Sequence, residues 1–140
     1  MSFLPEDDLE VLKRREIVYE LKVEKLPDGN ERRAIVFPGF TFEGNLYTEN
    51  ENGRVPCLTC DLLVIVPSGY ATTRLDSFYT IPILKRADGQ DPECAAGRAD
   101  LFGRNGWQFW SRHLTESEWR VGIDGLETFL QYIRAELRRA

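Results

Sequence analysis

The segment from residue 107 to residue 119 holds the side chains of this chain that are best suited to chemistry. Its sequence is WQFWSRHLTESEW, and it contains the only histidine, His113, two residues after Ser111. A serine hydroxyl becomes a nucleophile when a base lies within hydrogen-bond reach. Histidine is the side chain whose ordinary pKa lies near neutrality. In an extended segment alternate residues point to the same face, so Ser111 and His113 would be neighbours.

A structural interpretation of the same segment stands beside the chemical one. All three tryptophans of the chain, Trp107, Trp110 and Trp119, fall within it. Large aromatic side chains bury more apolar area than other side chains, which predicts a segment packed against the core. In this interpretation the tryptophans are core residues, and Ser111 and His113 only satisfy backbone groups beside them.

The cysteines are the second group that could do chemistry. Cys57 and Cys60 form a CxxC, and Cys94 lies far from them in the sequence. A CxxC is typical of redox pairs or of half a zinc site. Redox pairs begin a helix, whereas this one opens an apolar run, and further zinc ligands would have to come from Cys94 and His113. The favoured interpretation is free structural thiols in a reducing compartment, with no cofactor and no metal.

Composition limits the classes of function. The chain has 140 residues, is 42% hydrophobic and carries a net charge of −5, which predicts one globular domain over residues 1–140. A pI near 5.0 argues against a nucleic-acid partner. No apolar run approaches the roughly 18 residues that span a membrane, and the N-terminus lacks the basic and apolar regions of a secretory signal. We therefore expect a cytoplasmic protein that binds neither nucleic acid nor membrane.

The elements that must position these side chains follow from periodicity. Four segments show strand patterns, either alternation of apolar and polar residues or a short apolar run bounded by turn residues. They are residues 17–24, 32–37, 58–66 and 76–81. Residues 38–56 and 83–106 are rich in Gly, Asn and Asp, and we expect little regular structure there.

Helices are predicted at both ends of the chain. Residues 5–16 begin with proline and three acids and end with bases, which suits the helix dipole. Asp124 followed by Glu127 resembles a capping box. The apolar residues after it form one helical stripe, made up of Leu126, Phe129, Leu130, Ile133 and Leu137. The whole pattern predicts an α+β fold, in which helices pack on one antiparallel sheet.

This order, with four short motifs, resembles the ubiquitin-conjugating enzyme fold and in particular its bacterial family E. The motifs are Pro67-Ser-Gly-Tyr70, Leu75 to Pro82, Trp107 to His113, and Trp119 to Asp124. The resemblance covers roughly residues 17–140. It implies a four-stranded antiparallel meander with an N-terminal and a C-terminal helix.

The resemblance also implies an activity, but the nucleophile departs from the family pattern. Conjugating enzymes carry a catalytic cysteine shortly before the tryptophan that matches Trp119, and that position is Ser111 here. The His-Pro-Asn tripeptide that precedes the family's site is also absent. The implied protein is a carrier in a bacterial ubiquitin-like conjugation pathway. Its implied partners are a ubiquitin-like protein, an adenylating activating enzyme and a protein target.

Three chemical interpretations remain open. In the first, Ser111 forms an oxyester with the acyl group, His113 is the base, and Arg112 offsets negative charge on the acyl oxygen if the backbone turns there. Otherwise Arg112 is in an ion pair at the surface or at the edge of the core. In the second, Cys94 is the acceptor and forms a thioester, because a thiolate is the better nucleophile. In the third, the domain binds a ubiquitin-like protein without accepting it.

Overall fold

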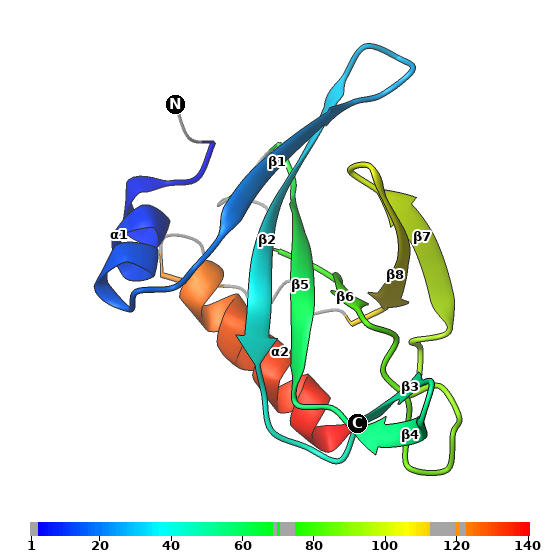
Figure 1. The fold of residues 1–140 in the computed structure, drawn as a ribbon. Coiled ribbons are helices and arrows are strands. Elements are labelled where there is room, and N and C mark those ends of the chain that lie inside the picture. The colour runs from blue at the N-terminus through cyan, green and yellow to red at the C-terminus, as the bar shows by residue number, and fades with distance from the viewer. Residues whose placement is uncertain (1–2, 69, 71–74, 113–119, 121–122) are drawn as a thin grey trace.

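The fold is built on a curled antiparallel sheet with a helix at each end of the chain (Figure 1). The computed structural model describes residues 3–68, 70, 75–112, 120 and 123–140. The helices in this part of the chain are α1 (Glu6–Arg14) and α2 (Leu126–Arg139). The strands are β1 (Glu20–Lys25), β2 (Glu31–Thr41), β3 (Tyr47–Asn50), β4 (Gly53–Pro56), β5 (Thr59–Val66), β6 (Phe78–Ile81), β7 (Gly97–Leu101) and β8 (Arg104–Trp110).

The main sheet has six strands, so the prediction of a four-stranded meander is wrong in its strand count. The strand order is β1-β2-β5-β6-β8-β7, and every pairing is antiparallel. The four predicted strands correspond to β1, β2, β5 and β6. The two additional strands come from the end of the segment in which we expected little structure and from the tryptophan motif. A separate two-stranded sheet, β3-β4, occupies the other such segment.

The β7–β8 hairpin was not predicted, because its turn lacks the residues that usually mark a hairpin in a sequence. Phe102 and Gly103 connect Leu101 to Arg104, and their φ angles are +53° and +75°. Two consecutive left-handed residues are what a tight two-residue hairpin turn requires. A phenylalanine in that region is uncommon, so the sequence carries no Asn-Gly or Gly-Gly mark of the turn. The strands themselves alternate only weakly in hydrophobicity.

Helix α2 packs its predicted apolar stripe against one face of the sheet. Leu126, Phe129, Ile133 and Leu137 are fully buried there, together with residues of β2 and β5. On the other face the β7–β8 hairpin encloses a second, smaller cluster, which consists of Ala34, Val36, Leu63, Leu101 and Trp107. In the described part of the chain, neither helix is long and apolar enough to cross a membrane.

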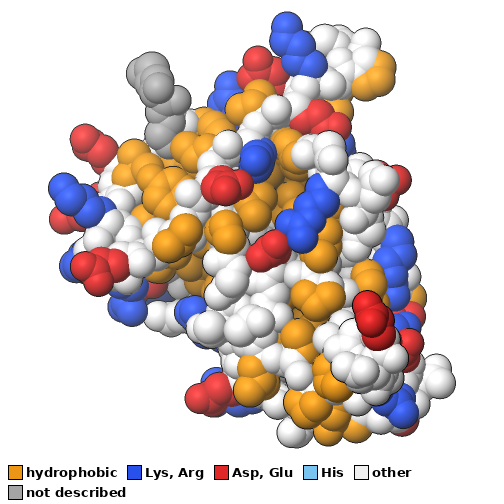
Figure 2. Space-filling model, in the orientation of Figure 1, with side chains coloured by type: hydrophobic (Ala, Val, Ile, Leu, Met, Phe, Trp, Pro, Cys, Tyr) orange, Lys and Arg blue, Asp and Glu red, His pale blue; other side chains and the backbone are white. Residues whose placement is uncertain are grey.

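The space-filling view shows where apolar side chains are exposed at the surface. Hydrophobic side chains gather over α1 and the neighbouring strands β1 and β2, and charged side chains surround them (Figure 2). Val18 and Val23 are more than half exposed, at 69% and 54%. Apolar atoms make up much of the surface of any folded protein, so apolar exposure as such is ordinary.

The N-terminus of α2 is capped from α1, so the predicted capping box is wrong. The N-cap residue is Gly125, and its neighbour Asp124 binds Arg120 instead. The Leu126 amide donates to Oδ1 of Asp8 at 3.1 Å. A side chain at Gly125 would place its Cβ 2.7 Å from that same oxygen, so any other residue here would have to displace the Asp8 carboxylate from its capping position.

Asp8 also accepts a hydrogen bond from the loop that follows β5. The Tyr70 hydroxyl donates to Oδ2 of Asp8 at 2.5 Å, and the Asp8 residue is only 5% exposed. Burial, and then the neighbouring Asp8 carboxylate, raises the pKa of the Tyr70 hydroxyl. The hydroxyl therefore stays protonated and keeps its role as a donor well above neutral pH.

Candidate functional site

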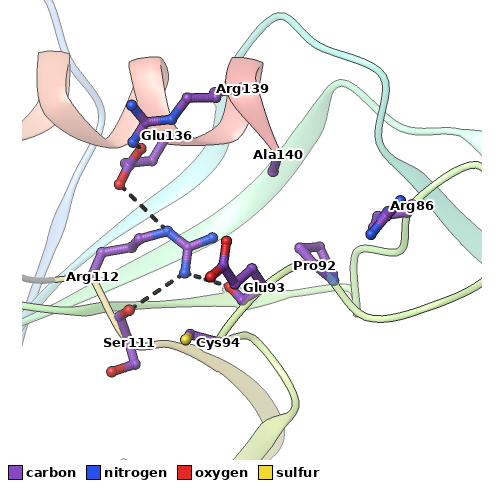
Figure 3. A pocket seen from close by; sticks show the side chains of 9 residues that line it. All are labelled: Arg86, Pro92, Glu93, Cys94, Ser111, Arg112, Glu136, Arg139 and Ala140. Atoms are coloured by element: carbon purple, nitrogen blue, oxygen red, sulfur yellow. Dashed lines mark hydrogen bonds and ion pairs between the residues drawn. The ribbon is translucent and has the colours of Figure 1, made fainter.

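A pocket of about 650 Å³ lies where the last turn of α2 faces the end of β8 and the loop before β7. The pocket is lined by Arg86, Pro92, Glu93, Cys94, Ser111, Arg112, Glu136, Arg139 and Ala140 (Figure 3). Three of the four predicted site residues, Ser111, Arg112 and Cys94, thus meet in one place. The fourth, His113, lies outside the described residues, as does Trp119.

Ser111 is placed by the buried strand end that precedes it. Strand β8 ends at Trp110, directly before Ser111. The predicted pairing of Ser111 with His113 lies outside the described residues. Trp110 is fully buried, stacks on Phe78 with ring centroids 5.5 Å apart, and donates from Nε1 to Thr80 Oγ1 at 2.9 Å. The predicted core role is thereby confirmed for Trp110. The same holds for Trp107, which is 2% exposed.

Cys94 is exposed, and its loop is bound to the end of β8 by backbone acceptors. The carbonyl oxygens of residues 93, 94 and 95 accept hydrogen bonds from Arg112 Nη1 at 2.6 Å, the Ser111 amide at 2.9 Å and Gln108 Nε2 at 3.0 Å. Cys94 has a φ of +55°, a left-handed conformation that is uncommon outside glycine. Non-glycine residues held in that region cluster at functional sites.

Gln108 is a positioning residue that sequence reasoning missed. It is fully buried in β8, where its Oε1 accepts from the Leu84 amide at 2.7 Å and its Nε2 donates to the Leu84 carbonyl at 2.9 Å. With the additional bond to Ala95, one amide fixes both ends of the loop that carries Cys94. The available signal was a polar residue within an aromatic run, because a buried polar side chain has to find partners.

Arg112 occupies the edge of the core and takes part in an ion pair, as one of the two expectations had it. Its side chain is 13% exposed, and its Nε lies 3.4 Å from Oε1 of Glu136, whose side chain is 7% exposed. The guanidinium also lies over the Trp110 ring, 5.2 Å from the centroid. Because Arg112 lines the pocket beside Ser111, the ion pair and a role toward an acyl oxygen are compatible (Figure 3).

The CxxC lies away from this pocket. Cys60 is buried, and burial raises the pKa of its thiol. Cys57 is half-buried and donates from Sγ to the Thr59 carbonyl at 3.1 Å. Within the described residues, no three His, Cys, Asp or Glu side chains are grouped so as to hold a metal ion.

Fold and site together define an α+β domain whose antiparallel sheet ends at a pocket lined by a serine, a cysteine and a fixed arginine. The chain belongs to prokaryotic E2 family E, whose family model matches residues 4–140. The resemblance seen in the sequence is thereby confirmed, and membership implies an E2-like fold and a conjugating-enzyme-like role. Comparisons with curated proteins and with solved structures give no match.

Proposed function

We propose that this protein is a carrier in a bacterial ubiquitin-like conjugation pathway. It accepts the C-terminal acyl group of a ubiquitin-like protein from an adenylating enzyme and passes it to a target. The observation that supports the proposal is that both possible acceptor residues line one pocket in a member of an E2 family. The Ser111 amide donates to the Cys94 carbonyl at 2.9 Å, which holds the two segments side by side.

The first acceptor is Ser111, which the spacing to Trp119 matches to the cysteine position of conjugating enzymes. Its oxygen attacks the activated carbonyl carbon, an oxyester bond forms, and the bond to the donor's leaving group breaks. The hydroxyl proton passes to a base, a role that the sequence spacing gives to His113. The fixed cation of Arg112 lines the same pocket, which supports a role in offsetting the charge that develops on the acyl oxygen.

Cys94 is the second acceptor, and its exposure in the same pocket favours it. A thiolate is intrinsically more nucleophilic than a hydroxyl, and the product would be a thioester. The left-handed backbone at Cys94 is the kind of strain that proteins keep where function requires a fixed side chain. The two acceptors differ in the chemistry of the adduct, which makes them separable.

The test is to incubate the protein with an activating enzyme, ATP and a ubiquitin-like protein of a bacterial conjugation pathway from the same organism, and to detect a covalent adduct by mass. We expect an adduct that is lost in Ser111→Ala and resists thiols, which identifies an oxyester. Loss in Cys94→Ala, together with cleavage by thiols, identifies a thioester instead. Ser68→Ala, on an exposed residue far from the pocket, and Cys57→Ala, on the half-buried thiol, are matched controls. If the wild-type protein forms no adduct in a system that is otherwise active, the carrier role is refuted in favour of binding only.

A further inference from the structure

Glu136 is a carboxylate in an unfavourable place. It lies in the last turn of α2, where the helix dipole disfavours an acid, and its side chain is only 7% exposed. Burying a charge costs free energy unless a partner compensates it. The compensation comes from Arg112 Nε at 3.4 Å, from the Tyr132 hydroxyl at 3.2 Å and from an ion pair with Arg139.

Arg112, the partner at the end of β8, contacts the backbone of Ser111 and of the residue before Cys94. Its Nη1 donates to the carbonyl of Glu93, the residue before Cys94, at 2.6 Å, and approaches the Ser111 carbonyl at 3.4 Å. Its Nε faces Glu136 (Figure 3). Its guanidinium carbon lies over the Trp110 ring. A guanidinium is planar, so fixing Nε on one side fixes the direction of the nitrogens on the other.

We infer that Glu136 is a positioning residue for acyl transfer, which acts through Arg112 and rests on the carrier function proposed above. Its carboxylate holds the guanidinium in the pocket and so keeps the Ser111 and Cys94 segments in one arrangement. Stability alone gives little reason for such a pair, since buried ion pairs often contribute no more than well-packed apolar residues would. The pair lies at the pocket, where a misplacement of about 1 Å can cost about 100-fold in rate.

The experiment measures single-turnover adduct formation as a function of donor concentration, below the melting temperature of every variant. Glu136→Gln keeps the shape of the side chain and removes its charge. We expect the maximal rate to fall about 10- to 100-fold, while the half-saturating donor concentration and the final yield of adduct stay unchanged. A purely structural role would instead lower the yield, because it reduces the folded fraction and leaves the rate of the remainder intact.

Two control variants separate position from general effects. Glu127→Gln removes the same charge from the same helix, where it pairs with Arg15 and lies outside the pocket lining. Glu24→Gln breaks an ion pair of 3.0 Å with Arg32 on β1 and β2, away from the pocket lining. Both variants should keep the wild-type rate. Glu136→Asp draws the carboxylate back by one methylene and keeps its charge, so it should lose rate to a smaller extent.

The decisive measurement is whether the effect of Glu136→Gln on the rate depends on the presence of Arg112. In an Arg112→Ala background, Glu136→Gln should cause no further loss of rate, because its effect passes through the arginine. Full additivity, or a wild-type rate in both Glu136→Gln and Glu136→Asp, would overturn the inference while the carrier function stands. A wild-type protein that forms no adduct refutes the carrier function itself, and with it the premise of this inference.

Discussion

Asp8 joins three segments of the chain, and replacing it with alanine tests whether α1 holds the N-terminus of α2. The substitution removes the acceptor of the Leu126 amide and the acceptor of the Tyr70 hydroxyl in one step. Because Asp8 is 5% exposed, water cannot readily take the place of the lost carboxylate. The Leu126 amide is then left in the interior of the protein, and the half-buried Tyr70 hydroxyl loses this acceptor.

The expected magnitude follows from these two bonds. Loss of a helix cap costs about 1 kcal/mol, and a half-buried hydroxyl that loses this acceptor costs about 1–2 kcal/mol. Alanine improves the helix propensity of α1 but removes an acid from its first turn, and these terms offset each other at about 0.5 kcal/mol each. The net loss is about 2–3 kcal/mol. With about 2.1 cal/mol/K of unfolding entropy per residue, a chain of 140 residues should melt about 7–10 °C lower.

Thermal and urea unfolding, followed by circular dichroism, measure this loss. Asp7→Ala is the matched control, because Asp7 is the same residue type in the same turn but is exposed. It should shift stability by less than about 0.5 kcal/mol. Tyr70→Phe removes one of the two donors and should cost about 1–2 kcal/mol. Combined with Asp8→Ala, it should add less than its own cost, because the two residues share one bond.

Equal stability of Asp8→Ala and Asp7→Ala would refute the capping argument. So would strict additivity of Asp8→Ala with Tyr70→Phe, since it would mean that the two side chains do not interact in solution. Hydrogen exchange at the Leu126 amide adds a local check. The free energy of opening measured at this amide should fall in Asp8→Ala by at least as much as the free energy of global unfolding.

Three further predictions concern other parts of the fold. Gln108→Leu should cost about 3 kcal/mol or more and speed hydrogen exchange at the Leu84 amide, because it leaves several buried backbone groups without partners; unchanged exchange at Leu84 would contradict this. Arg120 holds the pKa of the Asp124 carboxyl below its usual range, so this contribution to stability is present above the ordinary carboxyl pKa and is lost as pH falls through the lowered value. In Asp124→Asn, the free energy of unfolding measured by urea titration should therefore fall less steeply as the pH is lowered. An unchanged pH dependence would show that the ion pair contributes nothing. Cys94, the exposed thiol, should react with iodoacetamide before the other two cysteines. Peptide mapping by mass spectrometry measures this order, and equal labelling of all three would contradict the placement of Cys94 at the surface.

The parts of the fold that the sequence predicts are those with strong local periodicity. The stripe beginning at Leu126 and the apolar run at residues 58–66 became α2 and β5 with small shifts at their ends. In both segments the positions of the apolar residues already specify which side chains are buried, and the tertiary contacts agree with that local pattern. The strands β7 and β8 lack such a pattern, and their pairing depends on the left-handed turn at Phe102 and Gly103.

The site was predictable as a set of residue types and not as an arrangement. Ser111 and Arg112 stood out from the tryptophan motif, whereas Cys94 entered only as an alternative in a segment without a clear pattern. Their meeting depends on Gln108 and on backbone acceptors, which no spacing encodes. Asp8 shows the same limit, since its role as a cap for Leu126 spans 118 positions of the chain.

Strand β1 forms one outer edge of the sheet, and its composition has a consequence for how the protein behaves in concentrated solution. An edge strand offers unpaired backbone groups to which a strand of another molecule can add. Here that edge carries Glu20, Lys22, Glu24 and Lys25 within six residues, and Lys22 pairs with Glu20 at 3.2 Å. An added strand would have to strip water from these charges. The charged edge thus opposes edge-to-edge growth of the sheet into aggregates.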